Sequence, residues 1–243
     1  MPVPIHTLHL PTLSYRSRSE FLALRQRFVV ESALQNSESY LRNGCNASHF
    51  HKAGKDTGFG VPLIHIIDKS GLFTLRAYGQ EAVRTLQFWR METERRHPHV
   101  FTSSFSQDEM YLLDENQAAT TYQSQNYIPF SKCGIADGYF MDLEKTEIDP
   151  KSALQSRLIG NLRTFFRNLG VSDNGMDTRF RIMRYPTKAE DYIALYSGGK
   201  SIYKKAFALR VETNLLLPHY FSLGQNVGYG CGVFERCFNK TRI

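Results

Sequence analysis

The sequence is poor in cysteine, and its cysteines are not spaced as in a disulfide framework or a zinc finger. The 243-residue chain has four cysteines, and none of them forms a CxxC pair. Cys45, His49 and His51 could form part of a zinc site, but no further ligand lies at a usual spacing. We therefore expect reduced thiols, no bound metal and no cofactor.

Long apolar runs and nucleotide-binding loops are also missing. No stretch has the length of apolar sequence that crosses a membrane, and the N-terminus lacks a charged start followed by an apolar core. The expectation is a cytosolic protein without a membrane partner. Neither GxxxxGK[ST] nor a GxGxxG between a strand and a helix occurs, so no standard nucleotide loop is indicated.

Positive charge is in excess, with 30 Lys and Arg residues against 23 Asp and Glu residues and a net charge of +7. Such a balance favours a polyanionic partner, although it also serves solubility. Several basic residues fall on one predicted helix and one predicted strand of the second half. The candidate RNA contacts among them are Arg157, Arg163, Arg167, Lys204 and Lys205. A helix face that is merely solvated is the alternative.

Hydrophobic periodicity predicts an α+β fold in the first half. Strands are predicted over residues 5–15, 61–68, 72–78 and 110–113, and helices over 17–33 and 81–96. The order strand, helix, strand, strand, helix, strand is that of a ferredoxin-like domain, which RNA-recognition (RRM-like) domains share. The polar stretch 35–60 is predicted to be a long loop.

The second half has a less regular pattern. Strands are predicted over 139–143, 180–185, 203–212 and 232–238, and a helix over 149–168 with a buried stripe through Leu154, Leu158 and Leu162. No exact repeat occurs. Two halves of similar size nevertheless indicate two tandem ferredoxin-like domains, residues 1–120 and 121–243, with the boundary between residues 115 and 132.

The first stretch with chemical potential holds His49, His51 and Lys52 in the predicted long loop. Histidine exchanges a proton near neutral pH, and lysine neutralises phosphate charge. RNA can be cut without a metal because its own 2′-hydroxyl attacks the next phosphate. These three residues are therefore the candidate catalytic groups, and an ordinary polar loop with solvated histidines is the alternative.

The second stretch is rich in glycine and runs from residue 219 to 235. Glycine loses much backbone freedom on folding, so its concentration here needs a reason. Backbone N–H groups in tight turns can hold a phosphate, whereas plain tight turns at a sheet edge are the alternative. The candidate RNA-binding residues of this segment are Gly224, Gln225, Asn226, Gly228, Tyr229, Gly230 and Gly232.

Both stretches resemble one family. The run LRVETNLLLPHYFSLGQNVGYGCGVFE resembles the C-terminal signature of the CRISPR-associated RAMP endoribonucleases of the "Cas six" type. The residues that match it are Asn214, Leu217, Pro218, Leu223, Gly224, Gly230 and Gly232. The run HFHKAGKDTGFGVPLIHIIDKSGLFTLRAYGQEAVRTL resembles a subgroup with a His-x-His pair, a Pro-Leu-Ile strand and a Gly-x-Glu helix start. Its matches are His49, His51, Pro62, Leu63, Ile64, Gly79 and Glu81. Three positions depart from the family pattern, namely Gln225, Cys231 and His65.

The resemblance implies an activity and partners. Such proteins cut precursor CRISPR RNA at its repeats, and in the subgroup the paired histidines are the catalytic candidates. We expect the cleavage to need no metal and to leave a 2′,3′-cyclic phosphate and a 5′-hydroxyl. The implied partners are CRISPR repeat RNA, often a stem-loop, and other subunits of a CRISPR effector complex. One alternative is a non-catalytic RAMP subunit that binds the mature CRISPR RNA. A general RNA-binding domain is another, but the K/R-G-F/Y run of RNA-recognition motifs is absent.

Overall fold

The structure, a computed structural model, describes residues 2–30, 37–50, 62–69, 71–112, 114–129, 150–171, 180–184, 191–197, 200–224 and 227–238. The chain forms two compact units. The first contains Met1–Leu112, Asn168–Val171 and Gly228–Gly230; the second contains Leu113–Arg167, Ser172–Val227 and Cys231–Ile243. The sequence-based division at residues 120 and 121 stays a prediction.

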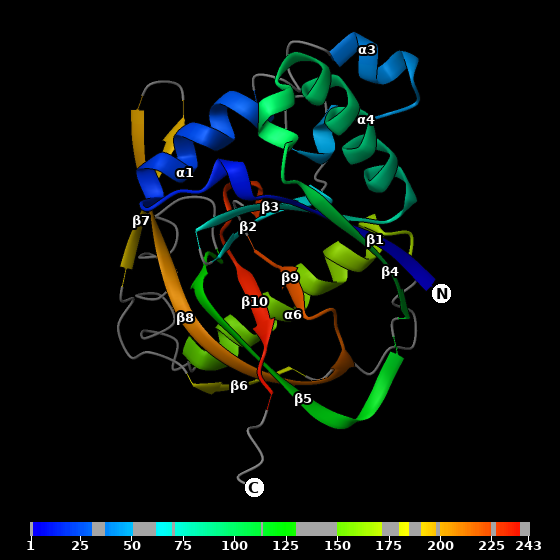
Figure 1. The fold of residues 1–243 in the computed structure, drawn as a ribbon. Coiled ribbons are helices and arrows are strands. Elements are labelled where there is room, and N and C mark those ends of the chain that lie inside the picture. The colour runs from blue at the N-terminus through cyan, green and yellow to red at the C-terminus, as the bar shows by residue number, and fades with distance from the viewer. Residues whose placement is uncertain are drawn as a thin grey trace, which may run out of the picture. The chain divides into compact units, whose positions relative to one another are not determined.

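A four-stranded antiparallel sheet forms the first unit, with strand order β2-β3-β1-β4. The strands are β1 (Pro2–Leu10), β2 (Ile64–Lys69), β3 (Leu72–Tyr78) and β4 (Phe105–Leu112). Helix α1 (Arg18–Arg25) lies between β1 and β2 in the chain, and α4 (Gln80–Arg96) lies between β3 and β4 (Figure 1). This is the predicted ferredoxin-like arrangement.

The helices cover one face of this sheet. Leu8 and Leu10 pair with Leu75 and Phe73 on neighbouring strands, and all four side chains are buried. The ring of Phe21 from α1 lies 5.6 Å from that of Phe73. These positions alternate along β1 with residues of the opposite face, as a strand covered by helices on one side requires.

Several local predictions for the first unit were wrong. The predicted loop 35–60 contains α3 (Ser37–Arg42) and the 3-10 turn η3 (Ala47–His49), because Tyr40 packs in the core with its ring 5.0 Å from that of Phe88. The α-helix α1 ends at Arg25 and continues as a π-helical turn, η2 (Gln26–Val30). Strand β4 begins at Phe105 rather than Met110, since backbone pairing with β1 decides its extent and its sequence does not alternate.

The second unit repeats the same strand order. Its sheet runs β6-β8-β5-β10-β9, and β7 pairs with β8. The strands are β5 (Asp114–Tyr127), β6 (Phe180–Arg184), β7 (Asp191–Ser197), β8 (Lys200–Leu216), β9 (Tyr220–Ser222) and β10 (Val233–Arg236). The core order β6-β8-β5-β10 corresponds to β2-β3-β1-β4, so the predicted fold class, α+β with two tandem ferredoxin-like domains, is confirmed.

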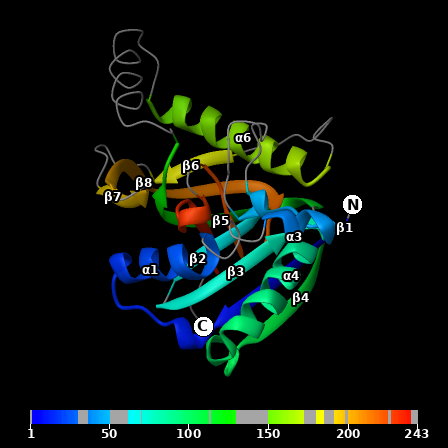
Figure 2. The same ribbon diagram turned by 90° about the horizontal axis from the view of Figure 1, so that it is seen from above.

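One helix covers this second sheet in the described ranges. Helix α6 (Pro150–Asn168) runs alongside β6 and β8 (Figure 2), and its predicted stripe, Leu154, Leu158 and Leu162, is buried. Phe165 and Phe166 of the same helix are buried as well. Between β8 and β10 the described residues hold β9 and the 3-10 turn η5 (Val227–Tyr229) in place of a second helix. The predicted strand 139–143 lies outside the described residues. None of the helices in the described ranges is long and apolar enough to cross a membrane.

Close backbone packing explains two of the glycines in the C-terminal segment. Gly224 has φ +94°, and a Cβ there would lie 2.6 Å from the carbonyl oxygen of Ile128. Gly232 has φ +66°, and a Cβ there would lie 1.9 Å from the carbonyl oxygen of Leu223. The N–H of Gly232 donates to Asn126 at 2.9 Å, so this backbone cannot move aside freely. Glycine is required at both positions by sterics.

Replacing Gly232 by alanine should lower the free energy of unfolding by at least about 2 kcal/mol, because the Cβ collides with a fixed backbone in a left-handed conformation. Urea unfolding measures this. Gly160→Ala is the matched control, because Gly160 lies within α6 and a Cβ there meets nothing within 4 Å. That change should stabilise the protein by about 1 kcal/mol. Equal effects of the two substitutions would contradict the steric explanation.

Burial of His65 should make the protein sensitive to acid. Burial lowers the pKa of His65 to about 4, with a smaller lowering from Arg76, although Nε2 bonds to the carbonyl of Pro62 at 2.8 Å. Below pH 6.5 His65 therefore becomes protonated in the unfolded chain but stays neutral in the folded protein. Stability should fall as the pH drops from 6.5 and be about 3 kcal/mol lower by pH 4. Urea unfolding of wild type and His65→Gln at several pH values tests this, and an equal slope in both would refute it.

Candidate active site around His49

The turn that carries His49 is built by local hydrogen bonds. Asn46 caps the 3-10 turn η3, and its Oδ1 accepts from the N–H of Ser48 at 2.9 Å. The N–H of His49 donates to the carbonyl of Asn46 at 3.1 Å. The next residue, Phe50, is 1% exposed, and its ring lies 5.9 Å from that of Trp89. His49 is therefore anchored from both sides, by a capped turn and by a core aromatic residue.

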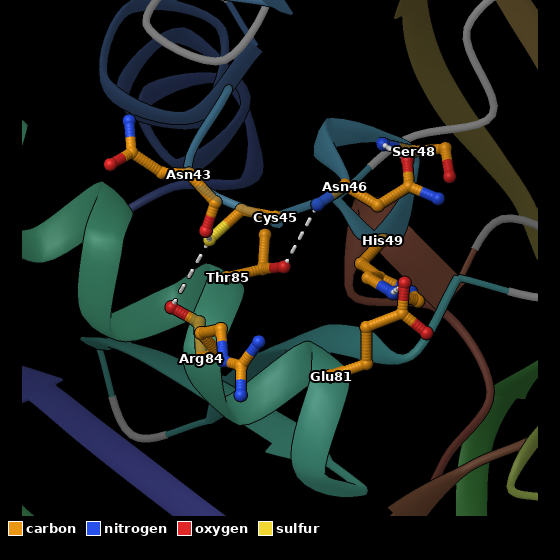
Figure 3. A network of polar contacts seen from close by, with 8 residues as sticks. All are labelled: Asn43, Cys45, Asn46, Ser48, His49, Glu81, Arg84 and Thr85. Atoms are coloured by element: carbon orange, nitrogen blue, oxygen red, sulfur yellow. Dashed lines mark hydrogen bonds and ion pairs between the residues drawn. The ribbon is translucent and has the colours of Figure 1, made fainter. Parts of the chain in front are cut away.

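Helix α4 holds this turn in place (Figure 3). The buried hydroxyl of Thr85 accepts from the N–H of Asn46 at 3.1 Å. The Sγ of Cys45 lies 3.8 Å from the carbonyl oxygen of Arg84. One turn earlier on the same helix, Glu81 points toward the His49 ring, with 3.7 Å between Oε1 and Nε2. Residues four apart lie on one face of a helix, so Glu81 and Thr85 both lie on the face of α4 that contacts the turn.

The environment of His49 favours its neutral imidazole. Burial lowers the pKa of His49, and the nearby negative charge of Glu81 acts in the opposite direction. The side chain is 12% exposed, against 65% for that of Glu81. Within the described residues, the buried Nε2 of His49 has no hydrogen-bond partner. A neutral imidazole has one ring nitrogen that carries a lone pair, and that nitrogen can accept a proton at neutral pH.

Cys45 takes no part in such chemistry. Burial raises the pKa of its thiol, which keeps the sulfur protonated. The described residues contain no group of three or more His, Cys, Asp or Glu side chains that could hold a metal ion. His51, the third member of the partial zinc pattern, lies outside them.

The glycine-rich segment meets the His49 turn at Gly228. Gly228–Gly230 belongs to the first unit, and a Cβ at Gly228 would lie 2.8 Å from the carbonyl oxygen of Phe50. The guanidinium of Arg25, which is 2% exposed, donates from Nε to the carbonyl of Gly228. Within the first unit, the structure therefore brings the end of α1, Gly228 and the histidine turn together, although the sequence separates them widely.

The other predicted site residues fall into distinct groups. His51, Lys52, Gln225 and Asn226 lie outside the described residues. Tyr229 lies in η5 and Lys205 in β8, and only their backbones are described. Gly230 is buried with φ +71°, and Gly224 and Gly232 have the packing roles given above.

The predicted basic residues lie on the second unit. Arg163 and Arg167 are exposed on α6, four residues apart, as predicted. Arg157 is exposed, and a hydrogen bond from its Nε to the carbonyl of Pro129 at 3.2 Å restricts its side chain. Lys204 is half-buried. Exposed arginines one helical turn apart can bind successive phosphates.

Sequence reasoning missed three residues that build the site. Arg25 has no pattern around it in the sequence that indicates burial, and its hydrogen-bond partner is 203 residues away in the chain. Thr85 carries no pattern that distinguishes it from other helix threonines. Glu81 did have a signal, because it follows Gly79 in the Gly-x-Glu match at the start of the helix.

Known structures share this architecture. A crystal structure of Cas6b covers 98% of this chain and 100% of its own, with a TM-score of 0.63 and 14% identity. A crystal structure of a CRISPR RNA processing endoribonuclease Cas6b gives the same coverage and TM-score at 17% identity. This chain has the Cas6 fold. Csf5, a type IV Cas6 crRNA endonuclease, aligns over the same share with a TM-score of 0.56 and 12% identity. No family model matches the Cas6-like chain, and neither does any curated protein sequence.

Within this Cas6 fold, Thr85→Val should loosen the His49 turn. Valine keeps the shape but leaves the N–H of Asn46 without its acceptor, which should cost about 1 kcal/mol and speed hydrogen exchange at that amide. Urea unfolding and amide exchange measure both effects. Thr164→Val is the control, because the Thr164 hydroxyl donates only within its own helix, to Gly160. Unchanged exchange at Asn46 would show that Thr85 does not hold the turn.

Proposed function

We propose that this protein is a metal-independent endoribonuclease that binds CRISPR repeat RNA and cuts it to produce mature CRISPR RNA. The observation that carries the proposal is a neutral, mostly buried histidine held by α4 within a fold shared with CRISPR RNA processing endoribonucleases. The sequence resemblance places His49 at the first position of the family's histidine pair. The net charge of +7 suits a nucleic-acid substrate.

His49 acts as the general base in the proposed reaction. Its imidazole takes the proton of the 2′-hydroxyl, and that oxygen attacks the adjacent phosphorus. The bond from phosphorus to the 5′-oxygen breaks, and the departing oxygen takes a proton from the general acid. The products are a 2′,3′-cyclic phosphate and a 5′-hydroxyl. His51 is the proposed acid, and Lys52 offsets charge on the phosphorane, because a lysine pKa of about 10.4 makes it a poor proton donor at neutral pH.

Different parts of the chain have different proposed roles in RNA binding. Arg163 and Arg167 supply exposed guanidinium groups for phosphates, together with Arg157, Lys204 and Lys205. The glycine-rich segment is proposed to let the RNA backbone approach closely, and Gln225, Asn226 and Tyr229 supply side chains. The cytosol is the proposed compartment, and other CRISPR effector subunits are the proposed protein partners.

Cleavage of the cognate repeat RNA in EDTA tests the proposal. Wild type should cut, His49→Ala should slow cleavage about a hundredfold or more, and His51→Ala should also slow it. A substrate with a 2′-deoxy sugar at the scissile position should bind equally well and remain intact. Mass spectrometry of the products should find the cyclic phosphate.

Three results would overturn the catalytic proposal or part of it. Tight binding without any cleavage by wild type would identify a non-catalytic RNA-binding subunit, the alternative that shares this fold. Loss of cleavage in EDTA that returns with added Mg²⁺ would replace the 2′-hydroxyl mechanism with a metal-dependent one. Normal cleavage by both histidine variants would move the catalytic role to other residues.

A further inference from the structure

Glu81 is the charged side chain that acts on His49 in the part of the chain that the structure describes. It lies in the first turn of α4, directly after Gln80 and the N-cap residue Gly79. The positive end of a helix stabilises a carboxylate at this position. Its oxygen Oε1 lies 3.7 Å from the buried Nε2 of His49, which has no hydrogen-bond partner within the described residues.

The backbone geometry fixes this pairing. Thr85 binds the turn of His49 from the same helix face on which Glu81 lies, so the two backbones are held at a set spacing. The Glu81 side chain is 65% exposed and can rotate, whereas the His49 side chain is 12% exposed. Rotation of the exposed carboxylate can shorten the distance of 3.7 Å between Oε1 of Glu81 and Nε2 of His49. An unpaired, buried Nε2–H on His49 would cost free energy. A hydrogen bond from this N–H to the Glu81 carboxylate would remove that cost.

We propose that Glu81 is a positioning residue whose carboxylate accepts the Nε2–H of His49 and so leaves Nδ1 as the nitrogen that takes the proton from RNA. This inference rests on the proposed role of His49 as the base. A neutral imidazole carries one N–H, so binding it at Nε2 places the lone pair at Nδ1. When Nδ1 accepts the proton, the Glu81 charge stabilises the resulting imidazolium.

Two substitutions separate the charge of Glu81 from its hydrogen bond. Glu81→Gln keeps an oxygen acceptor at the same reach but removes the charge, and Glu81→Ala removes both. Glu94→Gln is the matched control, because Glu94 lies on the same helix and pairs with Arg90 at 3.7 Å. Both positions, Glu81 and Glu94, are exposed enough for the three variants to fold.

Nitrogen-15 NMR of the free protein reads out the tautomer and the pKa of His49 without RNA. Wild type should hold the Nε2–H tautomer. Glu81→Gln should keep that tautomer and titrate at lower pH, because the favourable charge is gone. Glu81→Ala should titrate lower and populate both tautomers. Glu94→Gln should match wild type in both respects. An Nδ1–H tautomer in wild type, or a Glu81→Ala variant with wild-type tautomer and titration, would overturn the inference.

Single-turnover cleavage then connects the geometry to the reaction. The rate constant should fall about tenfold in Glu81→Ala and less in Glu81→Gln, while affinity for 2′-deoxy repeat RNA stays unchanged. Equal cleavage rates in wild type and Glu81→Ala would refute the positioning role. If wild type itself does not cut while the NMR results hold, the proposed function fails and the Glu81–His49 pairing stands, so the two failures are distinct.

Discussion

The docking of one short turn onto one face of α4 is the interaction on which the candidate site depends. Thr85 is completely buried and binds the backbone of that turn, while Ala82, Leu86 and Trp89 on the same helix pack into the core. A helix that is rigidly packed on its sheet can hold a polar group more precisely than a free loop can. The site therefore obtains its precision from the ferredoxin-like core, and the loop around it contributes the reactive side chain.

The glycine-rich segment combines two physical roles that the sequence alone could not separate. Gly224 and Gly232 allow backbones of the second unit to approach closely, whereas Gly228 allows the segment to lie against Phe50 in the first unit. Each of these close approaches is to a carbonyl oxygen. The same absence of a Cβ that admits a protein backbone would also admit a phosphate oxygen at the exposed parts of such a segment.

Strong periodicity made parts of the fold predictable. The buried stripe of α6 and the hairpin of β2 and β3 follow from apolar residues at regular spacing. Strand β5 could not be recognised, because DENQAATTYQSQNY offers mainly Tyr122 and Tyr127 as large buried residues and is held by its neighbours. In the site, His49 was identifiable from its residue type and neighbours. Arg25 was not, since its burial depends on a carbonyl far along the chain.

The bond between Arg25 and Gly228 also bears on how the protein is made. The two partners are separated by 203 residues, and both belong to the first unit. On the ribosome, the guanidinium of Arg25 therefore cannot make this bond until residue 228 has been synthesised. Contacts of such long range form late and slow folding. The contacts of Gly228 with Arg25 and with Phe50, which follows His49, therefore form only after the first 227 residues have been made.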